Sequence, residues 1–158
     1  MIKITIDREL TTYKIKGFYD LSLDELYEIN KARYEVFACE QKITSENDFD
    51  DKDKECYHLM VYYKDKIAGY CRILKAGMCY EVPSIGRVLV LREYRRYGLA
   101  KEMIKKAIDF IIYELEESEI KLSAQLYVRN LYESVGFKAV SDIYEEAGIE
   151  HIKMHYLK

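Results

Sequence analysis

Hydrophobic and polar residues recur along most of the chain with the periods of strands and helices. Residues 2–6 alternate apolar and polar side chains, and residues 13–19 form a second short strand candidate. Hydrophobic residues then recur at helical spacing from residue 23 to residue 39, and Ser22 and Glu25 have the spacing of a capping box. The N-terminal part is therefore predicted to form one or two strands followed by a helix over residues 23–39.

The middle of the chain has the pattern of a hairpin followed by a buried strand. Residues 56–63 are apolar and aromatic, residues 64–66 form a polar turn, and residues 67–75 resume a strand. Gly77 and Pro83 lie in the next connection, and residues 84–91 are largely aliphatic. We expect this last run to be a central strand of the sheet.

Helices and strands alternate in the C-terminal half. Residues 99–116 place hydrophobic side chains on one stripe, which predicts an amphipathic helix. We expect a strand over residues 120–126, a short helix over residues 128–135, and a left-handed helix end at Gly136. Residues 137–144 and 151–157 are predicted as two strands around a turn at Ala147 and Gly148. The whole pattern indicates an α+β fold.

One connection, residues 42–55, is rich in charge and has no hydrophobic period. Its acidic side chains are Glu46, Asp48, Asp50, Asp51, Asp53 and Glu55. We expect a loop with at most one helical turn. It is either a solvated connection or an acidic lip that attracts a cationic amine, and the two interpretations are compatible.

Composition narrows the classes of protein that the chain can belong to. A length of 158 residues, 49% of them hydrophobic, predicts a single domain over residues 1–158 with a sizeable core. A net charge of -3 disfavours a nucleic-acid partner or an anionic membrane surface. Neither a signal peptide nor a membrane span is apparent in the sequence, so we expect a cytoplasmic protein.

Cysteine and histidine usage gives little support to a metal site. The chain has four cysteines without a C-x-x-C pair, and three histidines. We expect no metal, and we expect the four cysteines to be reduced and buried: Cys39, Cys56, Cys71 and Cys79. His58, within an apolar run, and His151, near a turn, are interpreted as structural residues.

Residues 85–100 combine a strand, a basic turn and the start of a helix. The aliphatic strand leads into a turn rich in arginine, and Gly98 precedes the amphipathic helix. The free N–H groups of a first helical turn and the helix dipole favour an anion, and a glycine allows the backbone to approach a phosphate closely. We therefore expect this turn to bind a phosphate-bearing ligand.

Two motifs resemble those of the GNAT superfamily of N-acetyltransferases. Arg95-x-x-Gly98-x-Ala100 is similar to its pyrophosphate-binding signature, and residues 131–137 are similar to its L-Y-x-x-x-G-F block. The resemblance covers residues 22–158. It implies a central mixed, mostly antiparallel sheet that splays open between its fourth and fifth strands and is flanked by helices. It also implies transfer of an acetyl group from acetyl-coenzyme A to an amine.

Further blocks resemble the ElaA-like acetyltransferases within this superfamily. They comprise residues 35–41, 48–50, 85–88, 124–125 and 144–152. Three residues depart from the subfamily pattern, namely Tyr34, Cys39 and Ala147. The acceptor amine, of a small molecule or of a protein, is not set by the resemblance, and a homodimer is compatible with it.

The resemblance also implies roles for individual residues. The acyl donor would be held by backbone groups of the central strand and by the basic turn, which together comprise Val88, Leu89, Val90, Arg95, Arg96, Tyr97, Gly98, Leu99 and Ala100. Gln125 and Asn130 are further candidates for hydrogen bonds to the donor. Tyr132 matches the general acid that protonates the leaving thiolate, although simple packing is the alternative role for this tyrosine.

The general base is not determined by the motifs. No carboxylate interrupts residues 85–91, so water, Glu40, Asp50 or Asp51 could accept the proton. Two other functions stay open beside the acetyltransferase. They are a non-catalytic module that binds acyl-coenzyme A, and an enzyme similar to acyl-homoserine-lactone synthases. The Arg95-x-x-Gly98-x-Ala100 turn argues against the latter, which would bind an acyl carrier protein instead of coenzyme A.

Overall fold

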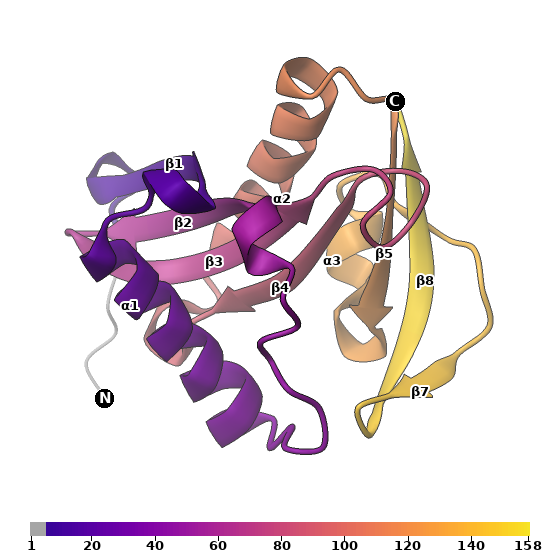
Figure 1. Cartoon of the computed structure of the whole chain (residues 1–158), viewed down its shortest axis with the longest axis horizontal. Helices are drawn as coiled ribbons and strands as arrows, with labels where there is room; N and C mark the ends of the chain where they lie inside the picture. The colour runs from indigo at the N-terminus through magenta and orange to yellow at the C-terminus, as the bar shows by residue number, and fades with distance from the viewer. Residues whose placement is uncertain (1–5) are drawn as a thin grey trace.

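A computed structural model describes residues 6–158 of the chain (Figure 1). Its strands are β1 (Thr11–Gly17), β2 (Tyr57–Tyr63), β3 (Lys66–Leu74), β4 (Ser84–Val90), β5 (Glu119–Gln125), β6 (Lys138–Ala139), β7 (Tyr144–Glu146) and β8 (Ile149–Leu157). Its helices are α1 (Leu23–Arg33), α2 (Leu99–Asp109) and α3 (Arg129–Glu133). The strand expected over residues 2–6 lies outside the described residues except for Ile6, which is not in a strand.

The strands form two groups that separate between β4 and β5. One group has the order β1-β2-β3-β4 and the other β5-β8-β6, with β7 also on β8. Every ladder among the described residues is antiparallel. Near the starts of β4 and β5, the Lys121 N–H donates a hydrogen bond to the Pro83 carbonyl (3.1 Å). Beyond this hydrogen bond the two strands diverge (Figure 1). The predicted splay is confirmed.

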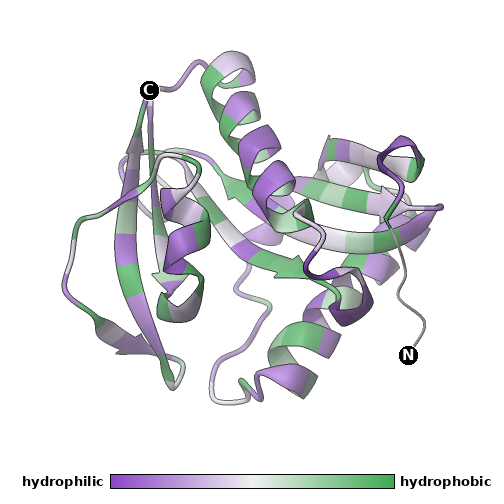
Figure 2. Cartoon of the chain, turned by 180° about the vertical axis from the view of Figure 1, so that it is seen from behind, coloured by the Kyte–Doolittle hydropathy of each residue, from purple (hydrophilic) through white to green (hydrophobic). Residues whose placement is uncertain are grey.

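Helices α1 and α2 lie on opposite faces of the first group of strands. Side chains alternate between the two faces of a strand. Along β3, a Cβ on Gly69 would lie 3.5 Å from Met103 of α2, whereas the next residue, Tyr70, has the Arg33 guanidinium of α1 5.9 Å from its ring. Hydrophobic and hydrophilic residues follow one another along α2, as the predicted amphipathic helix requires (Figure 2).

The first helix begins where the sequence predicts and changes its winding before its end. Ser22 Oγ accepts a hydrogen bond from the Glu25 N–H (3.0 Å), and Glu25 accepts one from the Ser22 N–H (2.8 Å), which completes the capping box. After Arg33 the helix continues as a π-helix over Tyr34–Glu40. In the same way α2 continues as a π-helix over Phe110–Glu114.

Strand β4 contains a bulge that the sequence pattern does not reveal. Tyr70 pairs with Leu89 and Arg72 pairs with Gly86, so β4 has one more residue than β3 over this stretch. Arg87, within the bulge, has a φ of 51°. The bulge changes the direction of the Arg87 side chain, which donates a hydrogen bond to Asp48 in the charged 42–55 segment.

Two predictions about the chain are wrong. Residues 137–144 do not form one strand, because after β6 the Ser141 hydroxyl accepts a hydrogen bond from the Lys153 N–H (2.9 Å) that would otherwise extend the ladder. Cys56 and Cys71 are buried as expected, but Cys39 and Cys79 are exposed because they lie on the π-helix and in a connecting loop. Among the described residues no helix is long and apolar enough to cross a membrane.

Gly136 provides a test of the packing between α3 and β8. It has a φ of +108°, and an added Cβ would lie 2.9 Å from the Tyr156 ring. We expect Gly136→Ala to lower the free energy of unfolding by about 1–3 kcal/mol, through backbone strain and overpacking together. Gly77→Ala is the matched control, because Gly77 also has a positive φ, +90°, but no atom lies within 4 Å of its added Cβ. Equal losses in urea denaturation would contradict the packing contribution.

Candidate active site

A cleft of about 1470 Å³ occupies the splay between β4 and β5. On the α2 side of the sheet it is lined by the start of α2 and by α3, including Leu99, Ala100 and Tyr132. On the α1 side it is lined by the π-helix, the 42–55 segment and the ends of β5 and β8, including Phe37, Phe49, Gln125 and His151. The cleft is therefore open to groups that come from both faces of the sheet.

The start of α2 presents unpaired backbone N–H groups to this cleft. Gly98 is the N-cap with a φ of +79°. The first hydrogen bond of the helix runs from the Glu102 N–H to the Gly98 carbonyl (3.2 Å), so the N–H groups of residues 99–101 have no acceptor within the helix. Arg8 supports the turn from the N-terminal side, because its Nη2 donates to the Tyr97 carbonyl (2.7 Å).

Arg95 is held by the protein itself. Its Nη1 and Nη2 donate to the two carboxylate oxygens of Glu40 (2.9 and 3.0 Å), and its Nε donates to the Val90 carbonyl (2.7 Å). Arg95 thus ties the turn to the π-helix and to the end of β4, and two of its five N–H groups are not used in these bonds. Arg96 lines the cleft and is exposed, with no ion pair among the described residues.

The other residues expected to hold the acyl donor lie in different surroundings. Val88, Leu89 and Val90 line the cleft from the β4 edge that faces β5. Gln125 lines it too, but its side chain and that of Gln41 are hydrogen-bonded to each other (2.9 and 3.2 Å). Asn130 is exposed and is not among the residues that line the cleft.

Tyr132 reaches the cleft from α3 and is almost completely enclosed. It is 5% exposed, and its ring packs edge-on against Phe137 with 5.8 Å between the centroids. Burial, reinforced by Cys71 and Tyr127, raises the pKa of Tyr132 above its ordinary value. Its hydroxyl therefore keeps its proton at neutral pH.

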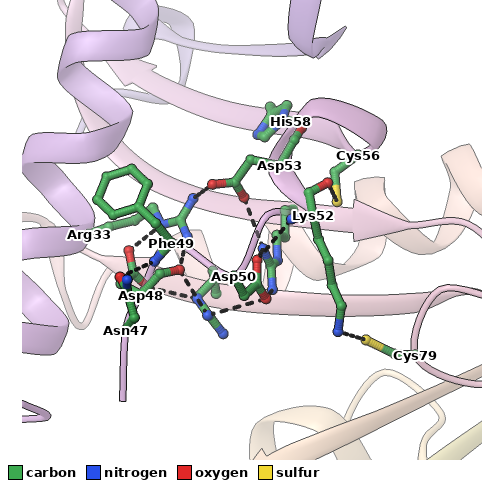
Figure 3. A network of polar contacts seen from close by, with 12 residues as sticks. Arg33, Asn47, Asp48, Phe49, Asp50, Lys52, Asp53, Cys56, His58 and Cys79 are labelled. Carbon is green, nitrogen blue, oxygen red and sulfur yellow. Dashed lines mark hydrogen bonds and ion pairs between the residues drawn. The ribbon is translucent and has the colours of Figure 1, made fainter. Parts of the chain in front are cut away.

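The acidic 42–55 segment is partly solvated, with Glu46, Asp51 and Glu55 exposed, and partly held against the sheet. Figure 3 shows three of its aspartates, Asp48, Asp50 and Asp53, turned inward onto arginines. Arg33, only 1% exposed, donates from Nε to Asp48 (2.8 Å) and from Nη1 to Asp53 (2.9 Å). Asp53 also accepts from Arg72 Nη1 (2.9 Å). A buried arginine is stable only when paired, so these contacts hold the segment across the α1 side of the sheet.

Arg72 and Arg87 complete this network. Arg72 Nη1 donates to Asp50 (2.8 Å), and Arg87 Nε donates to Asp48 (2.7 Å). The sequence contains a signal for it, since Arg33 lies among the hydrophobic positions of its helix and Arg72 lies within an apolar strand. A charged residue at a core position predicts a buried partner. Only Glu46 of the acidic side chains in this segment lines the cleft without an ion pair among the described residues.

The network leaves the expected bases poorly suited to accept a proton. Burial alone would raise the pKa of Asp50, but the hydrogen bonds and charge of Arg72 outweigh it and hold that pKa well below its ordinary range. Glu40 is engaged by Arg95, and Asp51 is exposed outside the residues that line the cleft. None of the three is a free carboxylate within the cleft.

The histidines differ in their surroundings. His58 is buried, with Nδ1 2.6 Å from the Tyr70 hydroxyl and Nε2 2.8 Å from the Asp53 carbonyl, and burial lowers its pKa. It is a structural residue, as predicted. His151 instead lines the cleft, which the sequence analysis missed. The described residues contain no cluster of three histidine, cysteine or acidic side chains that could hold a metal ion.

Comparison with known proteins agrees with this architecture. A model of the acetyltransferase (GNAT) domain matches residues 14–158. Protein ElaA of Escherichia coli (strain K12) is 32% identical over 136 residues, which cover 85% of this chain and 89% of ElaA.

Solved structures have the same fold. The crystal structure of an acyl-CoA N-acyltransferase from Pseudomonas aeruginosa has a TM-score of 0.85 at 30% identity and covers 92% of this chain and 99% of that one. Spermidine N-acetyltransferase from Vibrio cholerae, solved with CoA and spermine, has a TM-score of 0.70 over 95% of this chain and 96% of its own. At 17% identity, that likeness shows the fold alone.

The network predicts a particular loss of stability in acid. A carboxylate whose pKa is lowered by folding stabilises the protein above its unfolded pKa, about 3.9 for aspartate, and loses that contribution as the pH falls through its folded pKa. We expect Asp50→Asn to cost about 2 kcal/mol of unfolding free energy at pH 7 and to flatten the decline below about pH 4. Urea denaturation across pH measures both. Asp51→Asn, at an exposed site, should leave the profile unchanged.

Proposed function

Since the chain belongs to the acetyltransferase (GNAT) family and is an N-acyltransferase, we propose that it transfers an acetyl group from acetyl-coenzyme A to an amine of a small molecule or a protein. The transfer is direct, with both substrates bound at once. The observation that carries the proposal is the cleft lined from both faces of the sheet, because it lets a donor and an acceptor meet within the splay.

The α2 side fits the acyl donor. The free N–H groups at the start of α2 suit a pyrophosphate, and Gly98 adopts the left-handed conformation of the turn without a side chain between the backbone and the cleft. The β4 edge that faces β5 has backbone groups suited to the amides of the pantetheine chain, on Val88, Leu89 and Val90. Acetyl-coenzyme A supplies the activated acyl group. Gln125 lines the cleft, and its side chain is positioned by the hydrogen bond to Gln41. Asn130 does not line the cleft, so we assign it no role there.

Tyr132 supplies the proton for the departing thiolate. Its raised pKa keeps the hydroxyl protonated, and its position in the lining of the cleft brings it to the reacting groups. A binding module would not need a buried phenol at this point, so the geometry favours an enzyme over a non-catalytic acyl-coenzyme A module. The cytoplasmic location, the single-domain organisation and a homodimer stay predictions.

The anchoring of Arg95 gives one test of the donor site. We expect Arg95→Ala to weaken coenzyme A binding about tenfold or more, because the turn loses both a charge and its link to Glu40 and Val90. Pantetheine, which lacks the pyrophosphate, should lose little affinity in isothermal titration calorimetry. Glu40→Gln leaves the arginine charged but weakens its anchor, so a smaller loss is expected. Equal losses for coenzyme A and pantetheine would contradict a pyrophosphate site.

Replacement of the phenol tests the chemical step. Tyr132→Phe keeps the ring packing against Phe137, so acetyl-coenzyme A affinity should change by no more than a few-fold. The turnover number, measured as thiol release with a panel of amines, should fall about 10²- to 10⁴-fold. Tyr34→Phe is the matched control and should keep the wild-type turnover, because Tyr34 also lines the cleft but is exposed. Unchanged turnover in Tyr132→Phe would assign the proton to another donor.

A further inference from the structure

A polar cluster that the acyl-donor site does not use lines the α1 side of the cleft. Ser123 is on β5, Tyr144 and Glu146 are on β7, and His151 is on β8. Three of them, Ser123, Glu146 and His151, line the cleft itself. The cluster joins three strands at the open end of the splay, because β8 pairs with both β5 and β7.

The hydrogen bonds of His151 determine which ring nitrogen can accept a proton. Nδ1 lies 2.7 Å from the Ile149 carbonyl oxygen, which can only accept, so Nδ1 carries a hydrogen. In the neutral ring Nε2 then has a lone pair, and it lies 3.3 Å from a carboxylate oxygen of Glu146. Two acceptors face each other at this point. The contact becomes favourable when a substrate N–H donates to both acceptors, or when Nε2 carries a proton and donates to Glu146.

Glu146 is free to bind a cation. Among the described residues, its ion-pair partner is His151 rather than a lysine or an arginine. The Ser123 hydroxyl donates to the same carboxylate oxygen (3.5 Å), and it is also hydrogen-bonded to the Tyr144 hydroxyl. These contacts place the half-exposed carboxylate beside the cleft, and its charge has no cationic partner among them when His151 is neutral.

Other titratable and charged groups face this cluster from the neighbouring elements. The Tyr144 ring stacks on the His151 ring with 6.1 Å between the centroids, and Lys153 lies over the other ring of this pair, that of Tyr144 (5.8 Å). Tyr80, in the loop before β4, has its pKa raised to about 12 by burial and by nearby groups that include Tyr144 and Glu146. Tyr80 is therefore uncharged at neutral pH, and the carboxylate beside His151 is that of Glu146.

We propose that Glu146 and His151 form the amine subsite of this enzyme, in which the carboxylate binds a primary ammonium group and His151 Nε2 removes its proton. The inference rests on the proposed function and extends it to the acceptor side. It assigns the base to a histidine whose position near a turn suggested only a structural role. His151 is then a catalytic residue, and Glu146 binds the substrate and stabilises the imidazolium that forms.

The two faces of the sheet separate the two proton transfers. Residues paired across neighbouring strands share a face, and His151 pairs with Gln125, whose side chain bonds to Gln41 of the π-helix on the α1 side. Tyr132 comes from α3, on the other wall of the cleft. An amine that enters from the α1 side therefore reaches His151, the base, before it reaches the acyl group. The thiolate leaves on the side of Tyr132, the acid.

The protons and bonds balance with these two residues. The amine nitrogen bonds to the acetyl carbon while the bond between that carbon and sulfur breaks. The ammonium loses two protons in all. One goes to His151 Nε2 and then to solvent, and the other replaces the proton that Tyr132 gives to sulfur. No oxidant, reductant or metal enters this balance.

The chain contains a matched control for the pair. His155 is on the same strand as His151, and its Nε2 lies 3.1 Å from a carboxylate oxygen of Glu119. Residues 151 and 155 share one face of β8, because they are four residues apart on a strand. The pair of His155 and Glu119 is not part of the cleft lining. The pair of His155 and Glu119 therefore has the same chemical groups as the pair of His151 and Glu146, but it lies outside the cleft.

Steady-state kinetics with acetyl-coenzyme A test the assignment on three primary amines: butylamine, tyramine and Nα-acetyl-lysine. The fastest of them is followed across pH. We expect His151→Asn to lower kcat/KM about 10²- to 10⁴-fold and to remove the acid limb that an imidazole base imposes. Glu146→Gln should raise KM for the amine about tenfold or more, with acetyl-coenzyme A affinity unchanged. His155→Asn should match the wild type. Wild-type kinetics and pH dependence in both cluster variants would overturn the proposal.

A second measurement needs neither turnover nor a variant of His151 that folds. In the wild-type protein labelled with ¹⁵N-histidine and saturated with coenzyme A, the same three amines are added at constant pH. The Nε2 resonance of His151 should shift, while that of His155 should not, and Glu146→Gln should weaken the response. If no amine moves the His151 signal, the proposal is wrong.

The outcomes distinguish this inference from the proposed function. A protein that does not bind acetyl-coenzyme A contradicts the proposed function as a whole. A protein that binds it and acetylates an amine, with His151→Asn and Glu146→Gln as active as the wild type, contradicts only the amine subsite. In that case water or Glu46, which also lines the cleft, would have to take the proton.

Discussion

The missing ladder between β4 and β5 is the constraint on which the rest of this structure depends. Backbone N–H and C=O groups of a strand normally pair with a neighbour, and an unpaired edge costs free energy when it is buried. Here the two strands are joined near Pro83 and Lys121 and then separate. The edge beyond that point faces a cleft instead of a strand. The Val90 carbonyl there accepts from Arg95 Nε, and the other outward-facing backbone groups need a ligand or water as their partner. The fold thus builds its binding site from an interrupted sheet.

Buried charge keeps the α1 side of that cleft in place. Arg33 and Arg72 are enclosed by the protein, and three aspartates of one surface segment form ion pairs with them. Such pairs add little net stability, because the charges lose their hydration, but removing one partner is costly. We interpret the network as a device that specifies one position for the 42–55 segment. The bulge in β4 serves the same end, since it brings Arg87 to Asp48.

The two faces of the sheet have different chemistry. The α2 side offers helix N–H groups, a glycine N-cap and a buried phenol, which suit an anionic donor and a leaving group that must be protonated. The α1 side offers aromatic rings, Glu46, which has no ion pair within residues 6–158, and the pair of Glu146 and His151, which suit a cationic acceptor. An enzyme that joins an anionic and a cationic substrate gains from keeping these two environments apart.

Local chemistry allowed the sequence to determine the order of elements up to α3, the capping box at Ser22 and Glu25, and the strand, turn and helix around Gly98. Each depends on residues within a few positions of one another. Only the tertiary structure decided that Arg95 binds Glu40, that three aspartates of the 42–55 segment turn inward, and that His151 reaches the cleft. Those partners lie far apart in the sequence or depend on strand register, and a bulge or a π-helix changes which side chains meet.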